Sequence, residues 1–289
     1  MNTVPVFVSR NRPGALKTAR RRTGTPSHTL FQQPASLMVL AGLGFFLLEA
    51  ASGTAALLIF FPARTLGKGF FSLHGAIAFG CLLLAAVVKP PGLPAPAAAA
   101  AIGLAALYSL AAHAGRPAAA RPALVGAVVM AAWCLTRVAV VAPQGRGGLW
   151  TAAGAFLGGL LFGSALLTMN LGHWYLVSRS LPFRLLSRGA LLFAALAAAR
   201  TILLLAAAAA SPSREGLASL LSLESNALFF LFRVAWGIIG PIALSYFIWR
   251  TAHMRSNQAA TGLLYVALLF VLIGELLSSY LTVATGFPA

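Results

Sequence analysis

Runs of about 20 apolar residues recur along almost the whole of this chain. A helix of that length crosses the hydrocarbon core of a bilayer, and it satisfies its own backbone where no water is present. Of the 289 residues, 60% are hydrophobic and only 9% are charged, whereas about a quarter are charged in soluble domains. The sequence therefore predicts an all-α fold, a polytopic membrane helix bundle without an extramembrane domain.

Proline-containing connections divide the apolar sequence into separate spans, as helix breakers should. The eight expected spans are residues 35–61, 69–89, 95–114, 122–142, 149–178, 189–210, 225–249 and 259–285. With eight spans, both termini lie on one membrane face, the terminal side, and the opposite face is the far side. Residues 1–34 are basic and lack an apolar period, which predicts a disordered tail before a transmembrane domain at 35–289.

The formal net charge of +17 does not indicate nucleic-acid binding, because the basic residues are dispersed among short loops. Contacts with lipid headgroups explain them better, and the lipid bilayer is the expected partner. The loops on the far side carry more Lys and Arg, which favours a cytoplasmic far side, whereas the charges of the tail argue for the opposite orientation. We expect the protein in a bacterial inner membrane.

The stretch 149–182 is the predicted central helix. On a helical wheel Gly159, Gly163, Asn170 and His173 share one stripe, which has small residues at one end and polar groups at the other. Two Gly-x-x-x-Gly spacings lie in this span, Gly154/Gly158 and Gly159/Gly163. Such spacings let helix backbones approach closely in lipid, so we expect neighbours on several sides of this helix.

Two histidines lie at matching depth near the far side, His74 in the second span and His173 in the fifth. Axial ligation of a b-type haem requires such a pair on neighbouring helices. A quinone site formed by His173, Asn170 and Trp174 is an alternative, and an interfacial belt of amphipathic side chains is the structural interpretation. No spacing typical of a zinc, nucleotide-binding or nucleophile motif is present.

The acidic residues form a second group. Glu49 and Glu275 lie in the middle of apolar spans, where a carboxyl group is costly and usually has a partner or a function. Arg233 and Arg200 lie at similar depth in neighbouring spans, so we expect a direct or water-bridged contact between Arg233 and Glu275. Two interpretations stay open for these four candidate proton-transfer residues: a pair that fixes helix register, or a proton relay.

In helix number and in the lack of an extramembrane domain, the chain is similar to the membrane anchor subunits of respiratory oxidoreductases of the polysulfide-reductase type. The resemblance implies a redox subunit that exchanges electrons with quinone or haem b, takes protons through the Glu/Arg group and needs soluble redox subunits as partners. Such a subunit is not catalytic alone. A proton-coupled permease, with a helix broken at Pro241, is the alternative function. A structural membrane protein of an assembly is the third.

Overall fold

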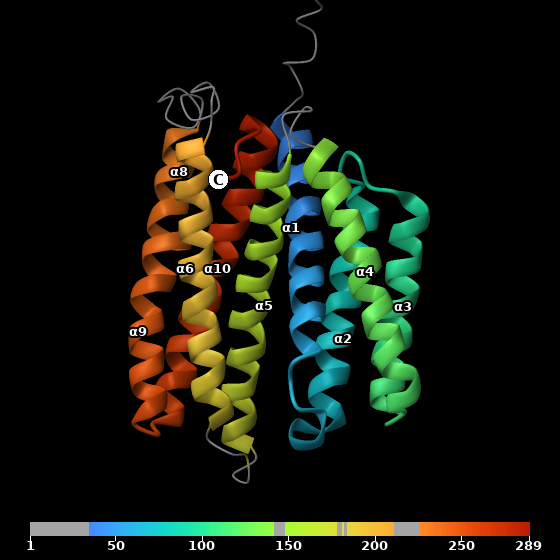
Figure 1. Ribbon diagram of the computed structural model, residues 1–289, viewed down its shortest axis with the longest axis vertical. Coiled ribbons are helices and arrows are strands. Elements are labelled where there is room, and N and C mark those ends of the chain that lie inside the picture. Colours follow the sequence, from blue (N-terminus) through green and yellow to red (C-terminus); the bar gives the residue numbers. More distant parts are fainter. Residues whose placement is uncertain (1–34, 142–147, 178–180, 182–183, 211–225) are drawn as a thin grey trace, which may run out of the picture. The chain divides into compact units, whose positions relative to one another are not determined.

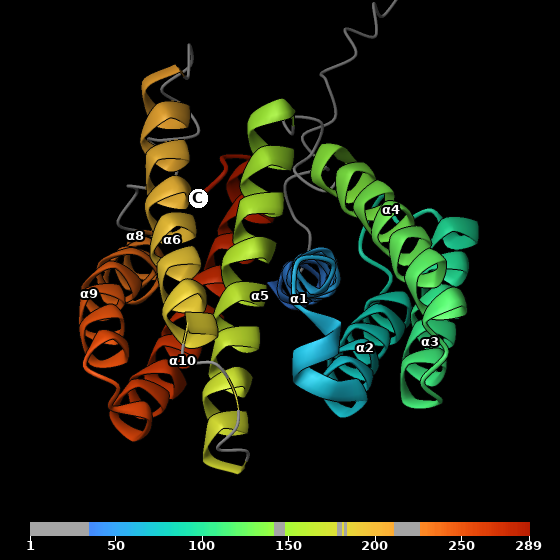
Figure 2. The ribbon, with the colours of Figure 1, turned by 60° about the horizontal axis from the view of Figure 1, so that its bottom comes forward.

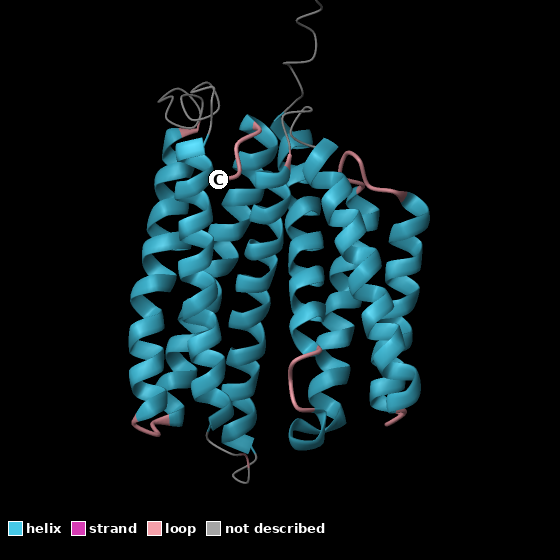
Figure 3. Cartoon of the chain, viewed as in Figure 1, coloured by secondary structure: helices cyan, strands magenta, loops and turns pink. Residues whose placement is uncertain are grey.

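The structure, a computed structural model, describes residues 35–141, 148–177, 181, 184–210 and 226–289. Its regular structure in these ranges is entirely helical (Figure 3). The helices are α1 (Ala35–Leu58), α2 (Ala63–Val88), α3 (Ala95–His113), α4 (Pro117–Val141), α5 (Leu149–Val177), α6 (Arg184–Ala210), α8 (Ala227–Val234), the π-helical turn η2 (Ala235–Ile239), α9 (Gly240–His253) and α10 (Asn257–Thr285). The predicted basic tail and the connection 211–225 lie outside the described residues.

Eight helical spans of the described chain are long and apolar enough to cross a membrane, which confirms the predicted fold class. The protein is a multi-pass integral membrane protein. Several boundaries differ from the expectation. The second helix begins at Ala63 and the sixth at Arg184, each a few residues earlier than expected. The fourth span begins at Pro117 and keeps Pro122 within the helix, and the seventh continues to His253. These extensions all lengthen helices at the far side.

Helices α1 and α5 lie side by side at the centre of the described bundle (Figures 1 and 2). Helix α1 contacts α2, α4, α5 and α10, whereas α5 contacts α1, α4, α6 and α10. Buried residues make up 72% of the membrane-spanning window of α1 and 78% of that of α5, more than in any other described span. The predicted central position of the fifth span is confirmed, and α1 shares it.

Glycines bring the backbones of α1 and α5 into direct contact. A Cβ atom on Gly163 would lie 2.8 Å from the carbonyl carbon of Gly53 and 2.8 Å from the amide nitrogen of Thr54. A Cβ atom on Gly159 would overlap the carbonyl group of Glu49. The close contact predicted at Gly159 and Gly163 is therefore confirmed, and it places the helix that carries Glu49 against the central helix.

The seventh span is continuous through Pro241, in contrast to the broken helix that the permease interpretation expects. The π-helical turn η2 precedes the proline and absorbs one extra residue, and such turns are frequent at functional sites. Within η2, a Cβ atom on Gly237 would lie 2.7 Å from the Cα atom of Gly274. This approach of two glycine backbones holds Arg233, at the end of α8, beside Glu275 of α10.

Candidate functional site

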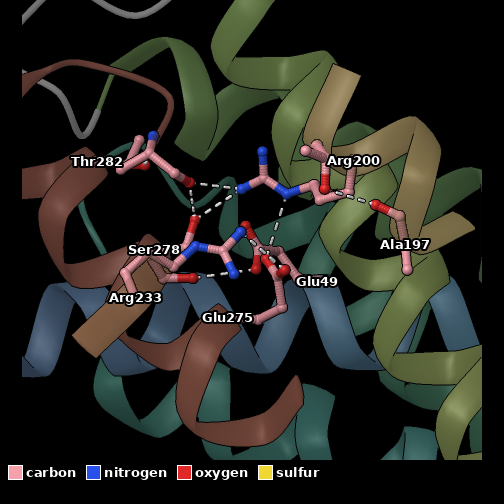
Figure 4. Close-up of polar contacts among 10 residues, drawn as sticks. Glu49, Ala197, Arg200, Arg233, Glu275, Ser278 and Thr282 are labelled. Atoms are coloured by element: carbon pink, nitrogen blue, oxygen red, sulfur yellow. Dashed lines mark hydrogen bonds and ion pairs between the residues drawn. The ribbon is translucent and has the colours of Figure 1, made fainter. Parts of the chain in front are cut away.

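Arg233 and Glu275 form the centre of a buried polar cluster (Figure 4). The Nη2 atom of Arg233 donates to Oε1 of Glu275 at 3.0 Å, which confirms the contact predicted from their matching depth. The Nε atom of Arg200, on α6, lies 3.5 Å from Oε2 of the same carboxylate. Glu275 therefore faces two guanidinium groups, one on each of its oxygen atoms.

Glu49, on α1, lies beside this arrangement and has a different kind of partner. The hydroxyl of Ser279 donates to Oε2 of Glu49 at 3.0 Å. No ion pair within 4.0 Å joins Glu49 to a cation among the described residues, although Figure 4 shows its carboxyl group near both guanidiniums. Gly158 of α5 faces both carboxyl groups, because a Cβ atom there would lie 2.5 Å from Oε2 of Glu275 and 3.6 Å from Oε2 of Glu49.

The chain after α10 folds back over Arg200. Gly286 ends the helix with a φ of 74°, a left-handed conformation that glycine adopts without strain. Arg200 Nη2 then donates to the backbone oxygen of Ala289 at 2.6 Å and to the hydroxyl of Ser278 at 2.7 Å. Ser278 also donates to the Ala289 oxygen. Arg200 is thus held by α10 and by the segment that follows it.

Small residues make room for the cluster on the surrounding helices. Besides Gly158, a Cβ atom on Gly154 would lie 3.5 Å from Nη1 of Arg200, and one on Gly274 would lie 3.1 Å from Nη1 of Arg233. The two Gly-x-x-x-Gly spacings of α5 therefore make different contacts. The pair Gly159/Gly163 contacts the α1 backbone, whereas Gly154 and Gly158 face the polar side chains.

The cluster is almost completely enclosed by protein. Glu49, Arg200, Arg233 and Glu275 are only 3%, 3%, 0% and 1% exposed. Several polar atoms nevertheless lack a hydrogen-bond partner among the described residues, namely Nε and Nη1 of Arg200, Nε and Nη1 of Arg233, and Oε2 of Glu275. Buried polar groups normally have such partners, so these atoms mark donor and acceptor positions inside the membrane that water or another ligand can use.

His74 lies outside this cluster, on α2, and pairs with Asn170. The ring is fully buried, and its Nδ1 atom is 2.7 Å from the backbone oxygen of Phe70. Its Nε2 atom is 3.0 Å from Nδ2 of Asn170 on α5. These contacts assign one tautomer, in which Nδ1–H donates to the carbonyl group and Nε2 accepts from the amide.

The structure pairs His74 with Asn170 and not with His173, whose side chain is exposed near the end of α5. Both nitrogens of His74 already have protein partners, so a haem iron at Nε2 would have to displace the Asn170 amide. Trp174 packs edge-on against the ring of Phe70, with centroids 5.9 Å apart. Asn170 and Trp174 are half-buried, beside the exposed His173.

Sequence reasoning missed Ser278 and Ser279, although two adjacent hydroxyls one turn after a mid-membrane glutamate were a readable signal. In the part of the chain that the structure describes, no group of three or more His, Cys, Asp or Glu side chains is arranged to hold a metal ion. No protein-family profile, curated protein or solved structure matches this chain. The chemistry of the buried cluster is thus the main basis for a functional conclusion.

Proposed function

We propose that the protein transfers protons within the membrane through the buried Glu/Arg cluster, with Glu49 as the group that exchanges the proton. The observation that supports this most strongly is the unequal pairing of two adjacent carboxyl groups. Glu275 has two cationic partners, at 3.0 and 3.5 Å, whereas Glu49 has the neutral hydroxyl of Ser279. A carboxyl group held by two guanidiniums is a fixed counter-ion, and one that faces a hydroxyl is free to change its protonation state.

Ser279 suits this role because a hydroxyl can donate to a carboxylate and can accept from a carboxylic acid. The contact with Glu49 therefore persists when the carboxyl group gains or loses a proton. Glu275, Arg200 and Arg233 stay in place during the exchange. The unpartnered N–H groups of the two arginines offer positions for water molecules that would carry the proton to and from Glu49.

Within this proposal the chain is the membrane subunit of a redox complex in a bacterial inner membrane, where soluble redox subunits bring electrons to a quinone. The quinone would lie near the far side at Asn170, His173 and Trp174. Reduction of a quinone consumes protons, and a mid-membrane carboxyl group can supply them. Haem b at His74 and His173 is the alternative cofactor, and its iron would have to displace the Asn170 amide from Nε2 of His74. A Soret band, or quinone that co-purifies with the wild type and is lost from Asn170→Leu, would support this part, and their absence would count against it.

The purified full-length chain in liposomes tests the proton-transfer step. Potassium-loaded vesicles treated with valinomycin develop an inside-negative potential, and a trapped pH dye reports proton entry. We expect acidification with the wild type, little with Glu49→Gln and a reduced rate with Ser279→Ala. Ser164→Ala is the matched control, because this buried hydroxyl bonds only to the Leu161 backbone oxygen of its own helix. If vesicles with the wild type, vesicles with each variant and empty vesicles all acidified at the same rate, the proposal would be contradicted. The Glu/Arg cluster would then have only a structural role.

A proton-coupled transporter of an anionic substrate is the second candidate function. It is supported by the guanidinium N–H groups of Arg200 and Arg233 that lack an acceptor, since arginine binds carboxylates and phosphates through such donors. Acidification that requires an added carboxylate or phosphate on one side of the vesicle would favour the transporter. Acidification with potential alone would favour proton transfer without a second substrate.

A further inference from the structure

A separate cavity opens at the far side between the ends of α1, α2, α3 and α4. Its volume is about 820 Å³, and it lies outside the Glu/Arg cluster. Phe71, Leu124 and Val125 form part of an apolar wall, whereas Lys68, Arg116 and Arg121 line the cavity with positive charge. The cavity is therefore amphipathic, with its charged part at the helix ends, where the headgroups of a bilayer lie.

Two of these cations follow directly after glycines in the left-handed conformation. Gly67, with a φ of 74°, precedes Lys68 at the kink near the start of α2. Gly115, with a φ of 69°, precedes Arg116 in the turn between α3 and α4. Residues with side chains rarely adopt this conformation, so the local sequence favours the turns that bring both cations to the cavity.

The three cations have no acidic partner in the described parts of the chain. The printed sequence has only four acidic residues, and the ion pairs of the described residues all belong to Glu275. No carboxyl group lines the cavity. Three positive charges around one cavity repel one another, and an anion between them would relieve that repulsion.

Tyr108 provides an independent sign of a ligand. Its side chain lines the cavity and is only 4% exposed, yet its hydroxyl has no hydrogen-bond partner among the described residues. The ring is fixed against Gly75, where a Cβ atom would lie 2.8 Å from it. Tyr108 lies five residues before the end of α3, about 7.5 Å along the helix from that end at 1.5 Å per residue. A phospholipid whose phosphate lies at the helix ends would place its ester carbonyl groups deeper, toward Tyr108.

We propose that this cavity binds the headgroup of an anionic phospholipid. The lipid phosphate lies among Lys68, Arg116 and Arg121, an ester carbonyl accepts from the Tyr108 hydroxyl, and an acyl chain follows the apolar wall. The apolar wall and the depth of Tyr108 favour a lipid over a soluble phosphate. A soluble phosphate would contact neither the apolar wall nor the Tyr108 hydroxyl. This site is independent of the proton-transfer proposal.

Native mass spectrometry of the full chain in neutral detergent tests the site with phosphatidylglycerol, phosphatidylcholine and inorganic phosphate as probes. The pocket variant carries Lys68→Gln, Arg116→Gln and Arg121→Gln. The control variant carries Arg184→Gln, Arg188→Gln and Arg250→Gln, which removes the same charge from far-side helix ends outside the cavity. We expect the pocket variant to lose at least about tenfold in phosphatidylglycerol affinity, and the control to lose little.

Tyr108→Phe removes only the hydroxyl and should weaken phosphatidylglycerol binding severalfold, with an unchanged melting temperature. Equal affinity of the pocket and control variants would overturn the proposal. The proposal would also be overturned if the wild type bound phosphatidylcholine as tightly as phosphatidylglycerol. Displacement of the lipid by inorganic phosphate at similar concentration would also overturn it, and would indicate a site for a soluble anion.

Discussion

The Nη2 atom of Arg233 lies 3.0 Å from Oε1 of Glu275, and the two side chains are only 0% and 1% exposed. This pair joins the seventh span to the eighth at the level of the glycine contact between Gly237 and Gly274. Because Arg200 of α6 also faces Glu275, the carboxylate is the common counter-ion of arginines from two helices, α6 and α8. We therefore expect Glu275 to stabilise the packing of these helices against α10.

Loss of Glu275 should therefore destabilise the protein through the arginines that remain. Breaking a buried ion pair by removing one partner typically costs about 3–5 kcal/mol. We expect Glu275→Gln to lower the membrane yield and the melting temperature in detergent. Arg233→Met combined with it should partly restore both, because the double variant no longer buries an unpaired guanidinium at this position.

The same measurements on Arg233→Met alone complete the comparison. Arg200 loses its contact with Glu275 in both variants that carry Glu275→Gln and keeps its bonds to Ser278 and the Ala289 oxygen. The single and the double variant share that loss, so they differ only at Arg233. Additive losses in the double variant would show that Arg233 and Glu275 are energetically independent, which contradicts a structural pair.

The depth of polar residues could be read from the sequence, but their direction around each helix could not. Counting residues along the spans was enough to predict the Arg233–Glu275 contact and the matching depth of Arg200. The position of Glu49 beside Glu275 depends on the contact of α1 with α10. The spacing of apolar residues within a helix does not show which distant helix it will contact. The pairing of His74 with Asn170 rather than His173 has the same cause, since both α5 residues share one stripe of the helical wheel.

Gly163→Leu should disrupt the contact between the two central helices. The first side-chain atom would lie 2.8 Å from the backbone of α1, and a helix backbone cannot move as a flexible side chain can. Overpacking costs about 1–3 kcal/mol even where neighbours relax, so we expect at least that loss in unfolding free energy. Gly103→Leu is the control, because this exposed position has no atom within 4 Å of an added Cβ.

Gly158→Ala tests the space between the two carboxyl groups. The added methyl group would lie 2.5 Å from Oε2 of Glu275, which must then move away from Arg200 or Arg233. We expect a lower melting temperature and a severalfold slower proton flux in vesicles. Gly80→Ala, which meets no atom within 4 Å, should leave both unchanged. A Gly158→Ala variant that behaves like Gly80→Ala would show that the cluster tolerates displacement of Glu275.

Asn170→Leu should leave Nε2 of the buried His74 without a donor. An unsatisfied buried acceptor costs about 1–3 kcal/mol, so the unfolding free energy should fall by that amount. Thr136→Val is the control, because the Thr136 hydroxyl bonds only within its own helix. Unchanged stability of Asn170→Leu would indicate that His74 can find another partner, as it would if it ligated a haem.

The central claim is that Glu49, and not Glu275, carries the exchangeable proton. Dicyclohexylcarbodiimide tests this most directly, because this apolar reagent adds to membrane-embedded carboxyl groups that carry a proton. Peptide mass spectrometry then identifies the modified residue in the vesicles used for the flux assay. We predict an adduct on Glu49 whose occupancy equals the fraction of proton flux lost, with Glu275 unmodified. An adduct on Glu275 with Glu49 free, or full flux after Glu49 has reacted, would contradict the claim.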